Sequence, residues 1–252
     1  MKIITLTNNK GGVTKTTSSI NLGYALALQN FKVGLIDFDS QKNLSFNIEN
    51  AGGSTLEQCL NNKSIKLSDF ATTNNSNLYV LKNKGNVTLS VFSQFNADEQ
   101  PYLLLDCLEN LEADAFDFII IDTPPNLELQ TINSLIASDY ALIPATLETN
   151  SIIGVDTTLQ AIKRIQSRLN PKINLLGVFI SKYDERLTST NNIMSEKILS
   201  LVDETKYIKS KIRTNSNYAK NQAISLSIFE SKDARGIDDY NALSQELLKE
   251  IN

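Results

Sequence analysis

The hydrophobic positions of this chain follow two different periods. Short continuous apolar runs, rich in Ile, Val, Leu and Phe, are typical of strands that are buried on both faces. Between these runs, apolar residues recur every three or four positions, which is typical of helices with one buried face. The predicted strands are Lys2–Thr7, Val33–Asp39, Leu78–Leu81, Phe116–Asp122, Tyr140–Ala145 and Ile173–Ser181.

Helical periodicity is clearest in three stretches, which are Ile20–Gln29, Ile152–Leu169 and Ile237–Ile251. Apolar strands that alternate with amphipathic helices predict an α/β fold with a doubly wound, mostly parallel sheet and helices on both faces. The segment Ala51–Asn77 is polar and rich in Asn and Ser, so we expect it to be a surface excursion. No linker divides the pattern, and we expect residues 1–252 to form a single domain.

Composition narrows the possible functions. The chain has no histidine, which excludes mechanisms that depend on imidazole. Cys59 and Cys107 are too few for a disulfide framework, and neither lies in a Cys-x-x-Cys pair. No apolar run could cross a bilayer and no signal peptide opens the chain, so we expect a cytoplasmic protein. The net charge of −4 argues against nonspecific DNA binding by the whole surface, but it permits a local basic patch.

The first strand is followed by a candidate phosphate-binding loop. Residues 8–17 read Asn-Asn-Lys-Gly-Gly-Val-Thr-Lys-Thr-Thr and lead into a helix, where backbone N–H groups and the helix dipole favour anions. In the motif G-x-x-x-x-G-K-[ST], Lys15 would reach the β- and γ-phosphates and the Thr16 hydroxyl would bind Mg²⁺. Asn9 and Thr14 stand at the two glycine positions of that motif. A Gly-Gly turn with incidental lysines is the alternative interpretation.

Two other predicted strands end in aspartate. Asp37 and Asp39 end the second strand, and Asp122 ends the strand before Thr123-Pro124-Pro125. The carboxyl ends of strands in an open α/β sheet face the crevice where ligands bind. An apolar strand that ends in aspartate is the Walker B arrangement, which holds Mg²⁺ directly or through water. An Asp-x-Asp pair at a strand end also often does no more than cap a loop.

These three segments together resemble the motifs of the ParA/MinD family of ATPases, which have a deviant phosphate loop. Lys10–Thr17 resembles the family's KGGxGKTT, Asp37–Gln41 resembles its DxDPQ, and Asp122–Pro125 resembles its DxPP. Ser40 replaces the proline of the second motif, and Lys42 replaces a frequent glycine. The resemblance implies binding of ATP or ADP with Mg²⁺. The implied nucleotide-binding residues of the loop are Lys10, Gly11, Gly12, Val13, Thr14, Lys15, Thr16 and Thr17.

The resemblance also implies roles for single residues. Lys10 occupies the place of the family's additional lysine, which reaches across an ATP-bound homodimer to the partner's nucleotide. Asp39 would position the attacking water. The residues expected to act in catalysis are Lys10, Lys15 and Asp39, and those expected at the metal are Thr16, Asp37 and Asp122. Thr14 stands where glycine lets the backbone approach phosphate, so we expect altered affinity or turnover.

The second half of the chain resembles ParA proteins in particular. Ser181–Arg186 resembles their TMYDSR stretch, Ile212–Asn215 with Ser227–Phe229 resembles IRTN…SIF, and Ala234–Tyr240 resembles SRGAxDY. By this resemblance, the side chains expected to border the adenine base are Arg213 and Asn215.

DNA binding is suggested by a basic segment. Between Thr205 and Phe229 there are five basic residues and no acidic one, which is a local charge reversal in an acidic protein. Arg186 matches a position that contacts DNA in ParA relatives, whereas their second DNA-contacting arginine falls on Asn217 here. The residues expected to bind DNA are Arg186, Lys209, Lys211 and Lys220. The alternative interpretation is an ordinary solvated face of lysines.

We therefore expect an ATPase of DNA partition with slow intrinsic hydrolysis. Its ATP-bound dimer would bind nonspecific DNA on the nucleoid, and a ParB-type centromere-binding protein would stimulate hydrolysis and release it. The chain begins at its first strand, as in the short kind of ParA without an N-terminal helix-turn-helix segment, and we expect no membrane partner. The alternatives are a noncatalytic nucleotide-dependent regulator, if Thr14 abolishes turnover, and a membrane-surface ATPase of MinD type.

Overall fold

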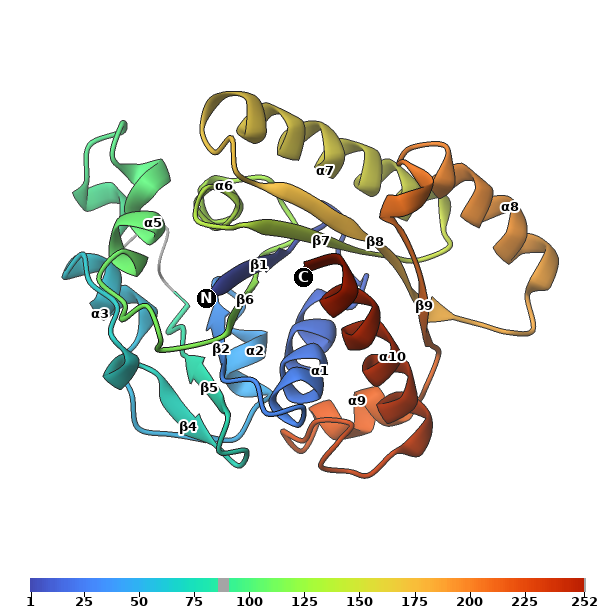
Figure 1. The fold of residues 1–252 in the computed structure, drawn as a ribbon, viewed down its shortest axis with the longest axis horizontal. Coiled ribbons are helices and arrows are strands. Elements are labelled where there is room, and N and C mark those ends of the chain that lie inside the picture. The colour runs from blue at the N-terminus through green and yellow to red at the C-terminus, as the bar shows by residue number, and fades with distance from the viewer. Residues whose placement is uncertain (86–90, 252) are drawn as a thin grey trace.

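The computed structural model describes residues 1–85 and 91–251, in which nine strands form one sheet in the order β3-β4-β5-β2-β6-β1-β7-β8-β9 (Figure 1). The strands are β1 (Lys2–Leu6), β2 (Val33–Asp37), β3 (Asn50–Ala51), β4 (Ala71–Thr73), β5 (Leu78–Leu81), β6 (Phe118–Asp122), β7 (Tyr140–Ala145), β8 (Asn174–Tyr183) and β9 (Tyr207–Arg213). All neighbours from β5 to β9 are parallel, whereas β4 pairs antiparallel with both β3 and β5. The predicted α/β class with a mostly parallel sheet is confirmed.

Helices cover both faces of this sheet (Figure 1). They are α1 (Lys15–Ala27), α2 (Asn43–Phe46), α3 (Leu56–Asn61), α5 (Leu103–Leu108), α6 (Leu129–Ile136), α7 (Thr149–Arg168), α8 (Thr188–Leu199), α9 (Asn217–Gln222) and α10 (Ala234–Ile251). Short 3₁₀ turns lie at Leu67–Asp69, Phe92–Gln94, Gln100–Tyr102 and Glu204–Lys206. In the part of the chain that the structure describes, no helix is long and apolar enough to cross a membrane.

Neighbouring residues of the central strands pack on opposite faces of the sheet. Ile4 of β1 and Ile120 of β6 lie in the cluster that includes α1 and α10. Ile3 and Ile119, one position earlier on the same strands, lie in the cluster that includes α3 and α5. Because side chains alternate along a strand, burial on both faces requires the continuous apolar runs seen in the sequence.

The prediction that Ala51–Asn77 is a surface excursion is wrong. This segment contains α3 and β4, and five of its side chains are buried in the core next to α5. They are Leu56, Cys59, Leu60, Ile65 and Phe70. These apolar residues are unevenly spaced in a polar background, so neither period stands out, although tertiary packing still buries them.

Strand β9 was not among the predicted strands. Among the described residues it pairs only with β8 in the sheet, and its two buried residues, Ile208 and Ile212, are separated by three polar ones. Glu246 of α10 accepts hydrogen bonds from the backbone N–H groups of Lys209 (2.7 Å) and Ser210 (2.8 Å). A carboxylate on the helix thus satisfies donors of an edge strand that would otherwise be open to another chain.

Candidate nucleotide-binding site

The loop after β1 leads directly into the N-terminus of α1. Gly12 (φ 79°) and Thr14 (φ 69°) both have left-handed backbone, which turns the chain sharply before the helix begins at Lys15. No side chain caps this helix. The first N–H groups of a helix lack partners within it, and together with the helix dipole they attract an anion.

Lys15 is folded back over this loop. Its side chain is buried, and its ammonium group donates hydrogen bonds to the backbone carbonyls of Asn8 (3.0 Å) and Lys10 (3.3 Å). Burial lowers the pKa of Lys15, and the carboxylates of Asp122 and Asp39 oppose that change. The ammonium group is therefore held by neutral carbonyls at a point where an anionic ligand would be a stronger partner.

Thr16 and Asp122 meet because β1 and β6 are parallel neighbours, with Leu6 paired to Asp122. The Thr16 hydroxyl donates to Asp122 Oδ2 (2.7 Å), and the Ser19 hydroxyl lies 3.2 Å from Asp122 Oδ1. Asp122 is completely buried, and this burial, with the nearby charge of Asp37, raises its pKa to about 7.

The two aspartates after β2 have different surroundings. Asp37 is buried and accepts hydrogen bonds from the Ser45 N–H (2.8 Å), the Ser45 hydroxyl (2.6 Å) and the Asp39 N–H (3.2 Å). Burial raises the pKa of Asp37 to about 6. Asp39 lines the cavity described next, and its Oδ1 accepts a hydrogen bond from the Gln41 N–H (2.9 Å). Asp37 therefore anchors the start of α2, whereas Asp39 faces the open space.

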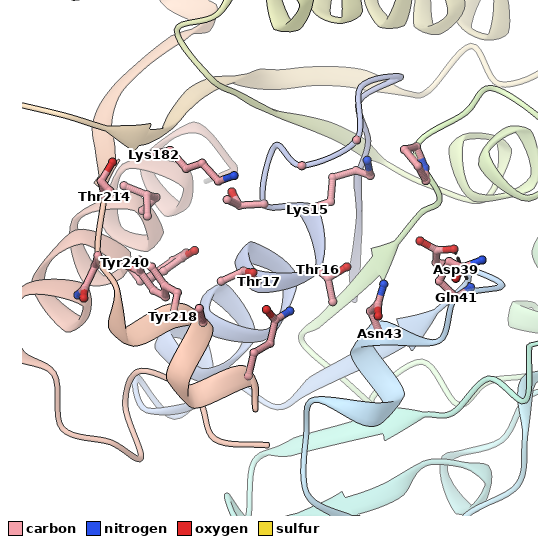
Figure 2. A pocket seen from close by; sticks show the side chains of 18 of the residues that line it. Lys15, Thr16, Thr17, Asp39, Gln41, Asn43, Lys182, Thr214, Tyr218 and Tyr240 are labelled. Carbon is pink, nitrogen blue, oxygen red and sulfur yellow. Dashed lines mark hydrogen bonds between the residues drawn. The ribbon is translucent and has the colours of Figure 1, made fainter. Parts of the chain in front are cut away.

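A cavity of about 500 Å³ extends on both sides of the phosphate loop (Figure 2). Asp39 and Gln41 lie at one end, and Tyr218 and Tyr240 lie at the other, with Lys15 between them (Figure 2). Tyr240 packs edge to face with Tyr218, with ring centroids 6.2 Å apart. One end of the cavity thus carries polar side chains and the Asp39 carboxylate, and the other is aromatic.

Most of the predicted nucleotide-binding residues line this cavity. Those that do are Gly11, Gly12, Thr14, Lys15, Thr16, Thr17, Arg213 and Asn215. Lys10 and Val13 are not part of the lining. Val13 is buried and its carbonyl accepts a hydrogen bond from the Ser181 hydroxyl (3.0 Å), whereas Lys10 is partly exposed beside the loop.

Sequence reasoning missed part of the lining. Its additional members include Gln41, Asn43, Pro125, Lys182, Tyr218 and Tyr240. Lys182 and Tyr240 belong to stretches that resemble ParA proteins, but the resemblance did not indicate that these two side chains would line the cavity. Tyr218 and Asn43 lie on the short helices α9 and α2, where no pattern indicated contact with the loop.

The side chains present suit magnesium that also has a phosphate ligand. Among the described residues, no group of three or more His, Cys, Asp or Glu could by itself hold a metal ion. Magnesium usually retains several waters and takes one or two protein oxygens together with substrate phosphates. The Thr16 hydroxyl and the Asp122 carboxylate, which touch each other next to the phosphate loop, fit that pattern.

The predicted DNA-binding residues differ in their surroundings. Arg186 has a side chain that is 86% exposed, and it forms an ion pair with Asp184 (2.6 Å). The Lys211 ammonium lies over the ring of Tyr183, and Lys209 and Lys220 are exposed. The basic segment itself contains no acidic residue, but carboxylates of α10 lie against it. Glu250 pairs with Lys206, Asp239 pairs with Arg213, and Glu246 binds β9.

Comparison with known proteins gives the family. A family model described as an AAA domain matches residues 1–175. The chromosome-partitioning ATPase Soj of Treponema pallidum is 30% identical over 98% of this chain and 97% of its own length. The chain belongs to the ParA/Soj-type family of P-loop ATPases.

Two solved structures show how far the likeness extends. A plasmid partition protein from Borrelia burgdorferi has a TM-score of 0.67 and 28% identity, with 92% of this chain and 98% of that one covered. Cobyrinic acid a,c-diamide synthase from Mycobacterium smegmatis, with bound ADP and magnesium, has a TM-score of 0.80 and 25% identity, with 99% of this chain and 94% of that one covered. The ligands of the latter agree with the nucleotide and metal expected from the sequence.

Two unusual backbone conformations lie at positions where the family pattern has glycine, one in the phosphate loop and one after β2. Thr14 replaces a glycine of the family pattern and has φ 69°, and Lys42 replaces another and has φ 50°. Left-handed backbone favours glycine, which suits the glycines of the family pattern at these two positions. This chain keeps the same left-handed conformation with threonine and lysine. The Thr14 hydroxyl, 3.2 Å from the Ser18 hydroxyl, is part of a contact that glycine could not make.

Proposed function

We propose that this chain is an ATP-dependent DNA-partition ATPase that binds ATP with Mg²⁺ and hydrolyses it slowly. The observation that carries this proposal is the arrangement of Lys15, Thr16 and Asp39 around one cavity at the N-terminus of α1, with Asp122 bonded to Thr16. Similarity to a Soj protein over almost the whole chain supports the partition branch of the family.

Each of these side chains has a distinct task in the proposal. Lys15 exchanges its two carbonyl partners for β- and γ-phosphate oxygens, which restores a full counter-charge to a buried ammonium group. Thr16 and Asp122 hold magnesium, which supplies charge neutralisation at the phosphates. Asp39 orients the attacking water from the cavity wall. Because the chain has no histidine, a carboxylate takes this task. Asp37 supports this site through the fixed start of α2.

Dimerisation around ATP is part of the proposal. Lys10 adjoins the phosphate loop but does not line the cavity of its own chain, which supports a role toward a second nucleotide. Two triphosphates that face each other concentrate negative charge, and a lysine from each subunit would neutralise the partner's nucleotide.

The ATP-bound dimer would bind nonspecific DNA and so localise to the nucleoid. Arg186, Lys209, Lys211 and Lys220 would contact phosphates, and a ParB-type partner would stimulate hydrolysis and release the DNA. For Arg186, a phosphate would have to replace the Asp184 carboxylate that now holds the guanidinium. DNA binding should therefore weaken strongly as salt is raised.

A noncatalytic nucleotide-dependent regulator is the second candidate, and the left-handed Thr14 is the observation that favours it. A β-branched residue at this position changes the surface that the loop offers to phosphate. ATP binding and ATP-dependent DNA binding without phosphate release would support the regulator over the ATPase.

The test compares the two lysines of the loop. Nucleotide affinity would be measured by titration with fluorescent ATP and ADP, and oligomeric state by sedimentation with each nucleotide. DNA binding and phosphate release would be assayed on the same purified proteins. Lys15→Ala should lose nucleotide binding, because its ammonium is the cation inside the loop. Lys10→Ala should bind nucleotide as a monomer but fail to form the ATP-dependent dimer. A Lys10→Ala protein that dimerises and hydrolyses ATP normally would contradict the proposed trans role.

A further inference from the structure

Lys182 brings a positive charge to the cavity without a carboxylate beside it. It lies on β8, one residue before the strand ends, and its side chain is exposed and lines the cavity. Figure 2 shows it on the same side as Thr214, with the amine directed toward the phosphate loop. Within residues 1–85 and 91–251, Lys182 takes part in no ion pair. A cation in this position is available to an anionic ligand.

The local backbone explains how Lys182 is directed there. Its φ of 53° is left-handed, and the pairing of β8 with β9 shifts register between Ile180 and Tyr183. Left-handed backbone is unfavourable for a residue other than glycine, and such irregularities are concentrated where a strand redirects a side chain beside a binding site. The irregularity at the end of β8 thus turns Lys182 toward the cavity.

Arg213, the cation expected at this wall from the sequence, is already occupied. Its Nη2 lies 2.6 Å and its Nε 2.8 Å from Asp239 Oδ1, and its Nη1 lies 3.8 Å from Glu185. Nη2 also donates to the carbonyl of Arg235 (3.3 Å). Because Asp239 of α10 and Glu185 already pair with the guanidinium, Lys182 is the lining cation on this side of the cavity that has no ion pair among the described residues.

We propose that Lys182 binds the α-phosphate of the nucleotide, an inference that rests on the proposed nucleotide site. With the β- and γ-phosphates at Lys15 and the base at the aromatic end near Tyr218, the α-phosphate lies between them, on the side that Lys182 faces (Figure 2). The α-phosphate is common to ATP and ADP. Lys182 therefore sets the affinity for both nucleotides and does not distinguish them.

The test measures the affinity for MgATP and MgADP in three variants. Lys182→Met places at this position the methionine of the similar TMYDSR stretch. This variant should weaken the affinities for MgATP and MgADP by a similar factor of about ten. A tenfold loss corresponds to the lower end of the energies found for a hydrogen bond to a charged group. Lys182→Arg should stay within about threefold of wild type, because the charge remains. Lys232→Met is the matched control, since Lys232 is also an exposed lysine with left-handed backbone (φ 57°) but does not line this cavity.

The outcomes separate this inference from the proposed function. If wild type binds neither nucleotide, both proposals fail. If wild type binds both and Lys182→Met binds them equally well, the nucleotide site stands and the role of Lys182 is overturned. Loss of affinity for ATP alone would place the contact at the γ-phosphate and would also overturn the assignment.

Discussion

Replacing Asp122 with asparagine should stabilise the nucleotide-free protein at pH 8. Asparagine has almost the same shape, and the hydroxyls that now bond Asp122, those of Thr16 and Ser19, can rotate to donate to or accept from its amide. The substitution therefore mainly removes a negative charge from a completely buried position. Burying a carboxylate is costly, and this cost is the free energy that the variant should recover.

The magnitude follows from the pKa of the carboxyl group. A pKa of about 7 in the folded chain, against an ordinary value of 3.8, is a difference of about three pH units, or about 4 kcal/mol at most. That pKa already includes the compensation by the Lys15 ammonium, and solvent relaxation makes the figure an upper bound, so we expect a gain of about 2 to 4 kcal/mol at pH 8.

The direction of the pKa change of Asp122 determines the pH range in which the two proteins differ in stability. Because the folded pKa lies above the unfolded one, the folded state keeps a proton that the unfolded state loses as pH rises from about 4. The stability of wild type therefore falls between pH 4 and pH 7 and then levels off, while the variant lacks this contribution. The two should be about equally stable near pH 4 and differ most above pH 7.

Urea denaturation of both proteins across this pH range, without nucleotide and with a metal chelator, measures the difference. Taking the difference between the two proteins cancels the titration of distant groups that they share, whereas Asp37, whose charge acts on Asp122, contributes to the difference. A variant that is less stable than wild type at pH 8, or a difference that does not vary with pH, would refute the reasoning. The same variant should also lose magnesium-dependent ATP binding.

Three other substitutions test separate parts of the site. Asp39→Ala should keep ATP binding, lose at least about 100-fold in phosphate release, and accumulate as a DNA-bound dimer; turnover at the wild-type rate would show that its assigned role is wrong. Arg186→Glu should weaken DNA binding without changing ATP affinity, with Arg164→Glu on α7 as the control. Thr14→Gly should be about 1 kcal/mol more stable than Thr14→Ala, because glycine relieves the backbone strain of the left-handed conformation. Both variants lack the contact with Ser18, so urea denaturation should give the alanine variant the lower free energy of unfolding.

The parallel core and the phosphate end of the site could be predicted because their signals are local. A strand buried on both faces requires a continuous apolar run, and the polar residues that follow it lie at the carboxyl edge of the sheet. Asp39, Asp122 and the loop at Lys15 were found in this way, although the second strand ends at Asp37 and not at Asp39.

At the aromatic end of the cavity the sequence indicated Arg213 and Asn215, but the other members come from distant segments and could not be predicted. Tyr218 lies on a six-residue helix, Tyr240 on the last helix, and Lys182 at an irregularity of β8. For the same reason the sequence of the basic segment does not show which acidic residues lie beside it. The carboxylates that bind β9 and Arg213 come from α10, so no short window of sequence contains both charges.

The sheet register also explains why the loop needs Lys15 before any nucleotide arrives. Asp37 is paired with Asp122 across β2 and β6, so two buried carboxyl groups lie on adjacent strands, and Asp39 follows two residues later. Each of the two buried groups has a raised pKa, to which the neighbouring charges add. Lys15 is the nearby cation that acts on Asp122, and its carbonyl bonds to the loop hold it in place. An arriving triphosphate would draw that ammonium away from Asp122, which together with Thr16 would be free to bind a divalent cation. The geometry therefore favours joint binding of nucleotide and magnesium over binding of either one alone.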